Sequence, residues 1–289
     1  MKLLCKVFLA CIFLFYGLIS FGKDRQVNDR PIEIKPFPLV ETGDTVIAPP
    51  KGVLAFYKKY INAGGIIIVS SDRVPNAALV AARKTVLYVL AQCPDIHKEM
   101  LKHNPRISIM AASEKASDLP EFGPGDDGQW GLGQMPDNPT SLVSEKGVCY
   151  EGNTHYIANF LLHEFVHMIH NLGIHFVAPE VENEIYAAYL SAVKKGFFKG
   201  PKDEPRENLS AFEAYGDDEY FTHMVNAWFD LNESLPGPWM DYKAGEWGPR
   251  SGTKEELKRN QPAVYEIISR YFPASGDDVI RKCTSKPKR

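Results

Sequence analysis

The sequence predicts an α+β protein in which strands belong to the N-terminal half and helices dominate the C-terminal half. Two β-branched runs, Ile66–Val69 and Arg106–Ala111, have the composition of buried strands. From residue 155 onward, apolar residues recur mainly at helical spacing. The chain has 289 residues, of which 44% are hydrophobic and 24% charged, and this is enough to bury one sizeable core.

The first 22 residues predict a secretory signal peptide, and we therefore expect a secreted protein. Lys2 and Lys6 give a positive start, an apolar run extends over residues 7–19, and Ser20 and Gly22 are small residues at the cleavage spacing. An uncleaved signal anchor is the alternative. No later segment has an apolar run long enough to cross a bilayer, so we expect no stable membrane insertion after cleavage.

The charge balance disfavours nucleic acid as a partner. Loss of the signal peptide lowers the basic residues from 33 to 31 against 36 acidic ones, which makes the formal charge −5. A net negative protein is poorly suited to bind phosphate backbones or anionic membranes. We expect the basic residues 276–289 to form a short tail.

Residues 23–50 carry many prolines and charges, which predicts an extended leader or linker ahead of a single folded domain over residues 51–275. Residues 76–92 show helical spacing of apolar residues, and Pro94 closes that helix. Residues 118–147 are rich in Gly, Pro and Asp, and we expect a long loop there. Gly173 is expected to end the helix that starts near residue 155. The later helices are predicted at residues 180–195, 217–230, after the Thr253 capping box, and 262–271.

Residues 163–167 carry the chemistry, because they fit the pattern H-E-x-x-H. On a helix, His163 and His167 lie one turn apart on the same face, so both imidazoles reach one ion. Glu164 is rotated away from them and is placed to accept a proton from a zinc-activated water. The motif therefore predicts a zinc-dependent hydrolase with Glu164 as general base.

A catalytic zinc needs a third protein ligand, and the residues leave several candidates open. His170 lies about 10 Å along the helix axis from His163, too far for the same ion, and we interpret it as a neighbour of the ligands. The other candidates are His175, Glu182, Glu184 and Glu219.

A family resemblance favours one of them. The motif at residues 163–167 is followed by a loop and by Glu219-Tyr220-Phe221, which opens an aromatic-rich helix. This arrangement resembles the gluzincin zinc metallopeptidases of the anthrax lethal factor and Pro-Pro endopeptidase type and their uncharacterised secreted relatives. The similarity extends from about Ile66 to Phe272. Besides the motif it includes residues 107–122, 149–150, 187–189, 196–200 and 255–262.

The resemblance implies a zincin-like fold, with a small mixed sheet, an active-site helix behind it and a mostly helical C-terminal part. It implies Glu219 as the third ligand of one Zn²⁺ ion. It also implies an endopeptidase that acts on a protein or peptide substrate, with Glu164 transferring the proton to the leaving amine.

Two positions depart from the family pattern. The relatives have an oxyanion-stabilising tyrosine seven residues before the ligand Glu, whereas this chain has Phe212 there. Tyr215 is the substitute candidate for that catalytic role. The relatives often have a second Glu four residues after the ligand, whereas this chain has His223, which we place beside the ligands with His170. The alternative function is therefore a catalytically weakened zinc-binding homologue that acts as a binding or toxin-like protein. A secreted structural domain with a chance motif is the third possibility.

Three cysteines remain after signal cleavage, and secretion favours a disulfide. Cys93 and Cys149 both lie at predicted element ends inside the domain, so we expect them to pair and Cys283 to be left over in the tail.

Overall fold

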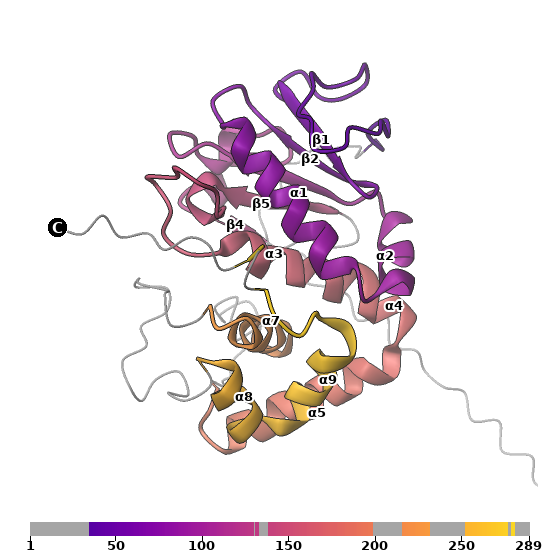
Figure 1. The fold of residues 1–289 in the computed structure, drawn as a ribbon, viewed down its shortest axis with the longest axis vertical. Coiled ribbons are helices and arrows are strands. Elements are labelled where there is room, and N and C mark those ends of the chain that lie inside the picture. The colour runs from indigo at the N-terminus through magenta and orange to yellow at the C-terminus, as the bar shows by residue number, and fades with distance from the viewer. Residues whose placement is uncertain are drawn as a thin grey trace, which may run out of the picture.

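The computed structural model describes residues 35–129, 131–132, 138–198, 216–231, 252–276 and 279–280. These residues form an α+β fold with a small mixed sheet and a group of helices below it (Figure 1). The predicted signal peptide, Phe212, Tyr215 and residues 281–289 of the basic tail lie outside the described residues.

The sheet has five strands in the order β1-β2-β3-β5-β4. Their bounds are β1 Lys59–Ala63, β2 Ile66–Ser70, β3 Arg106–Met110, β4 Gly131–Leu132 and β5 Thr140–Ser144. The three inner strands run parallel, and the two outer strands β1 and β4 are antiparallel to their neighbours. Residues 118–147 are therefore not a single loop. The buried strand β5 lies within them, and its run of Ser and Thr hid it from a hydrophobicity pattern.

Alternate residues of the strands pack on opposite faces of the sheet, as the two-residue period of a strand requires. Ile66 and Ile68 face a core that helices cover, whereas Ile67 and Val69 face the other side. The covering helices are α1 Asn76–Leu90, which packs on β1 and β2, and α3 Phe160–Ile169, which packs on β5 and β4.

Residues 35–57 cover the second face and are part of the fold. Phe37 is buried there with Tyr57, and the backbone N–H of Val40 donates to Tyr60 Oη. A β-bridge joins Ile47 to Tyr60. The segment is extended, as its prolines suggest, but the packed chain begins well before residue 51, where we expected the folded domain to start.

The C-terminal half consists of helices that pack on one another. Their bounds are α5 Pro179–Lys194, α7 Gly216–Trp228, α8 Lys254–Asn260 and α9 Pro262–Tyr271. The predicted capping box is present, because Thr253 and Glu256 cap α8 reciprocally. Figure 1 shows α3 running across the middle of the molecule, between the sheet above and α7 and α5 below.

The helix that carries the motif differs from prediction at both ends. It begins at Phe160 instead of residue 155, because Asn159 caps it by accepting a hydrogen bond from the N–H of Leu162. It does not stop at Gly173, since the chain continues through a π-turn, His170–Ile174, into the short helix α4, His175–Val177. Gly173 serves close packing: a Cβ there would collide with Ile96 of helix α2, Pro94–Leu101, an element that the sequence did not predict.

The expected disulfide between Cys93 and Cys149 is wrong. Cys93 is a free thiol in the core at the start of α2, and burial raises its pKa to about 12. Cys149 is disulfide-bonded, and its partner lies outside the described residues. The prediction rested on the position of Cys93 at the end of a helix, which gave no information about the direction of its side chain.

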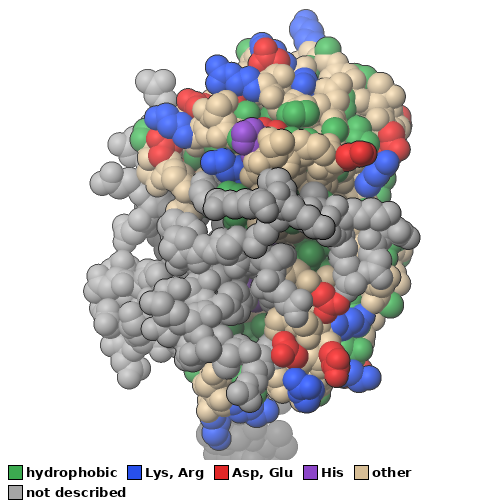
Figure 2. All heavy atoms as spheres, turned by 60° about the vertical axis from the view of Figure 1, so that its left-hand side comes forward, with side chains coloured by type: hydrophobic (Ala, Val, Ile, Leu, Met, Phe, Trp, Pro, Cys, Tyr) green, Lys and Arg blue, Asp and Glu red, His purple; other side chains and the backbone are tan. Residues whose placement is uncertain are grey.

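The described surface carries charges of both signs. In the face shown in Figure 2, Lys and Arg side chains are interspersed with Asp and Glu side chains over the parts that are not grey. Across the described stretches of the chain, no helix combines the length and apolar composition that a membrane crossing requires.

Candidate metal centre

The site forms where α3 and α7 pack against each other. Burial of Leu161, Phe165 and Met168 fixes the rotation of α3 in the core and leaves its histidines facing α7. At its N-terminus, α7 packs tightly on α5, because a Cβ at Gly216 would collide with the ring of Tyr189. These contacts bring two segments that are about 50 residues apart in sequence into register.

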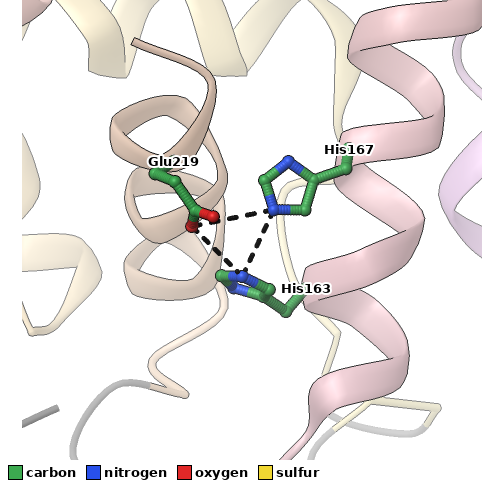
Figure 3. Close-up of side chains that lie close together, drawn as sticks. All are labelled: His163, His167 and Glu219. Atoms are coloured by element: carbon green, nitrogen blue, oxygen red, sulfur yellow. Dashed lines mark hydrogen bonds and ion pairs between the residues drawn. The ribbon is translucent and has the colours of Figure 1, made fainter. Parts of the chain in front are cut away.

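His163, His167 and Glu219 converge on one point (Figure 3). The Nε2 atoms of the two histidines are 3.3 Å apart. Glu219 Oε2 lies 3.5 Å from His163 Nε2 and 3.7 Å from His167 Nε2. The side chains are 13%, 6% and 15% exposed in the order His163, His167, Glu219, so the site is recessed but not sealed.

The separation of the two histidine nitrogens equals that of two ligands of a tetrahedral zinc ion, and the two distances to Glu219 Oε2 are a few tenths of an ångström longer. Nitrogen and oxygen ligands lie about 2.0–2.1 Å from zinc, which separates two ligand atoms in a tetrahedron by about 3.3–3.4 Å. Glu219 Oε2 is buried and has no hydrogen-bond partner among the described residues, as expected of an oxygen that faces a cation. The set of two imidazoles and one carboxylate is one of the common ligand sets of catalytic zinc.

The other ligand candidates have different contacts. His170 lies between two carboxylates, those of Asp218 and Glu182, and not among the three converging atoms. His175 is half exposed. Glu184 forms an ion pair with Arg270 on the protein surface. Among the described residues, only Glu219 joins the two motif histidines.

Glu164, the predicted general base, lies beside the ligands in a tightly enclosed position. It is buried, and a Cβ at Gly131 of strand β4 would collide with its carboxylate. Burial raises the pKa of Glu164, and the positive charge of His163 and His167 opposes this effect. A carboxylate with a raised pKa is suited to take up and release a proton near neutral pH.

The candidate ligands differ in their electrostatic environment. Burial alone would lower the pKa of His167, but Asp218 and Glu219 outweigh it and raise that pKa to about 10. Burial would likewise raise the pKa of Glu219, but the charge of His167 and His163 holds it below its ordinary value. A cation that binds here must displace the proton of His167, so binding is coupled to proton release.

His223 and Asn226 lie on α7 next to the candidate ligand His163. The ring centroids of His223 and His163 are 5.2 Å apart, and burial together with the charge of His163 lowers the pKa of His223 to about 3. The amide of Asn226 lies 3.2 Å from His163 Nδ1. His223 is therefore a neighbour of the ligands, as predicted, whereas sequence analysis missed Asn226.

Sequence analysis also missed Asp218, which contacts His167 of α3 and His170 of the π-turn that follows. The only sequence signal was that Asp218 immediately precedes the candidate ligand Glu219 at the start of a predicted helix. Tyr215, the candidate for the missing oxyanion donor, lies outside the described residues.

Comparison with known proteins adds no further information. No protein-family model matches the chain, and no curated protein is similar to it in sequence.

Proposed function

We propose that this protein is a secreted zinc-dependent hydrolase with a zincin-like fold, and that it acts as an endopeptidase. The single observation that carries the proposal is the convergence of His163, His167 and Glu219, with the buried carboxylate of Glu164 next to them. The motif on α3 was visible in the sequence, but Glu219 comes from a separate helix. Its Oε2 lies within 3.7 Å of the Nε2 atoms of both histidines, which supports one shared ion.

The residues of the chain have separate tasks in this proposal. Zinc, when bound, lowers the pKa of a coordinated water toward about 7. Glu164 would accept a proton from the attacking water on its carboxylate and would later donate it to the leaving amine. Its raised pKa supports both steps, because the protonated and ionised forms are then closer in energy at neutral pH.

The edge of the sheet supports a peptide substrate. Strand β4 pairs with β5 on one side and is the last strand of the described sheet. Gly131 of β4 is also the residue whose backbone lies against Glu164. An extended peptide that adds to such an edge through main-chain hydrogen bonds would lie next to the proposed base.

A second candidate function is zinc binding without efficient turnover. The observation in its favour is Phe212, which stands where the resembling peptidases have a tyrosine. Loss of one oxyanion donor typically lowers the rate by about 10²–10³-fold. A protein with this defect would hold zinc and act as a binding or toxin-like protein.

Metal analysis of the purified secreted protein tests the proposal. We expect one equivalent of zinc in the wild type and loss of zinc in both His167→Ala and Glu219→Ala. Absence of zinc from the wild type would refute the metal site, and release by the His167 change alone would show that Glu219 is not the third ligand. A diverse peptide library, with Glu164→Gln as control, then separates the two functions, because a zinc-loaded wild type without turnover supports the second.

A further inference from the structure

Asp218 joins a proposed zinc ligand on α3 to a second histidine, which opens the π-turn after that helix. Its carboxylate accepts two hydrogen bonds, from His167 Nδ1–H to Oδ2 at 2.8 Å and from His170 Nδ1–H to Oδ1 at 2.6 Å. Asn171 Nδ2 donates a further hydrogen bond to Oδ2 at 3.3 Å. Both carboxylate oxygens are thus held by α3 and by the π-turn that follows it.

The second histidine has a further acidic neighbour. The far side of the His170 ring faces helix α5, where its Nε2 lies at the ion-pair distance of 3.0 Å from Glu182 Oε1, without the alignment of a hydrogen bond. The His170 side chain is only 4% exposed, so it lies between two carboxylates away from solvent. Glu182, His170 and Asp218 therefore form a chain of contacts that connects α5, the π-turn and α7 and ends on His167.

The end of this chain determines how His167 presents its ring. A carboxylate can only accept a hydrogen bond, so the proton of the neutral imidazole must sit on Nδ1. The lone pair of His167 Nε2 is then free and lies on the side of the ring where His163 Nε2 and Glu219 Oε2 converge. Asp218 is also the chain neighbour of Glu219. A contact that fixes Asp218 on α3 therefore fixes the position of the third ligand as well.

The other ligand histidine has a neutral partner instead. Asn226 Nδ2 lies 3.2 Å from His163 Nδ1, and Asn226 Oδ1 is buried with no hydrogen-bond partner among the described residues. The two ends of an amide are assigned from the hydrogen-bond network, and rotation of this amide lets Oδ1 accept from His163 Nδ1–H. The charged contact is therefore specific to His167.

We propose that Asp218 is the positioning residue of the metal site. Asp218 selects the Nδ1–H form of His167 and holds α7 on α3 so that Glu219 reaches the ion. His170, with Glu182 behind it, holds Asp218 in place. The inference rests on the metal binding in the proposed function but not on peptidase activity. Partners of ligand histidines typically change metal affinity by about 10- to 100-fold when they are altered.

Zinc affinity of the full secreted chain, measured by competition with a chromogenic chelator, tests this role. We expect Asp218→Asn to weaken zinc binding by about 10- to 100-fold and His170→Gln to weaken it less, because Asp218 then keeps its bond to His167. The matched control is Glu184→Gln, which removes a carboxylate of α5 that, among the described residues, pairs with Arg270 on the surface. Equal affinity of Asp218→Asn and wild type would refute the proposal.

A cobalt(II) spectrum distinguishes positioning from general destabilisation. If Asp218 orients His167, the visible bands of the cobalt-loaded Asp218→Asn protein shift in position or intensity relative to wild type; bands that match the wild type at saturating metal would refute the role. If Asp218→Asn does not fold, zinc affinity and the cobalt spectrum of His170→Gln test the role of Asp218 instead. A wild type that holds zinc but cleaves no peptide refutes the endopeptidase and leaves this inference intact.

Discussion

Two clusters of buried charges lie in different parts of the molecule and differ in what balances them. The first, which we call the sheet network, consists of Tyr57, Arg106, Ser108 and Glu121. Tyr57 Oη donates to Glu121 Oε2 at 2.5 Å and lies 2.8 Å from Ser108 Oγ, and the Arg106 guanidinium is 3.5 Å from Glu121 Oε1. A permanent cation of the chain thus stands beside the carboxylate.

The second cluster, the helix network, consists of His163, His167, His170, Asp218 and Glu219. Its histidines carry charge only when protonated, and three of its ligand atoms converge within 4.8 Å with no Lys or Arg among them. The comparison shows that burial of charge alone does not indicate a functional site. The helix network differs in that its lone pairs converge where no described residue provides a fixed cation, and such a set favours an ion from solution.

Replacement of the proposed base should have the largest effect on activity. We expect Glu164→Gln to lower kcat by about 10²–10⁴-fold, because the amide cannot take up the proton. The zinc content should stay at the wild-type level, since Glu164 is not among the converging ligands. Peptide turnover and metal content on the same sample measure both. Full activity in this variant would mean that the helix network has no base on α3.

Disruption of the sheet network should affect stability and not metal binding. Arg106→Met leaves Glu121 buried without its cation, and we expect the free energy of unfolding to fall by about 3–5 kcal/mol. Urea unfolding of the metal-free protein measures this loss. The double variant with Glu121→Gln should recover part of it, because no unpaired charge remains. Zinc affinity should stay within about twofold of wild type, and a larger change would show that the two networks are coupled.

The helix network should also make the stability of the protein depend on pH through His170. Burial would lower the pKa of His170, but Asp218 and Glu182 raise it to about 10, against an ordinary value of about 6.5. The folded state therefore binds this proton more tightly, and the stabilisation is complete below pH 6.5 and lost as the pH rises toward about 10.

We accordingly expect the metal-free protein to lose roughly 1–3 kcal/mol of stability between pH 7 and pH 10. His170→Gln should reduce this slope, because the variant has no ring to bind the proton. Denaturant unfolding across this range provides the measurement. An unchanged slope in His170→Gln would contradict the charged state assigned to His170.

The smallest effect is expected at strand β4. Gly131 does not need a positive φ, so alanine fits the backbone, but its Cβ would press on the Glu164 carboxylate. Displacement of a catalytic group lowers rates, and we expect Gly131→Ala to reduce kcat by about tenfold, with zinc binding unchanged. Comparison with Gly125→Ala, where a Cβ meets no neighbouring atom, controls for a general effect of the substitution.

Much of the local structure was predictable from the sequence. The helices α1, α5, α7 and α9 and the strands β2 and β3 lie where periodicity and β-branched runs place them. His163 and His167 were predictable as a pair, because a spacing of four on a helix places two side chains on one face whatever surrounds it. Where the local pattern was ambiguous, as for β5 with its Ser and Thr, prediction failed.

Only the tertiary structure decided the rest of the site. The residues alone left Glu182, Glu184 and Glu219 open as ligands, and the packing of α3 against α7 brings Glu219 to the histidines while Glu182 turns to His170. It also revealed Asp218 and showed that Cys93 is free. The physical reason is that periodicity fixes neighbours within one element. A contact between residues 51 positions apart depends on which faces the core buries.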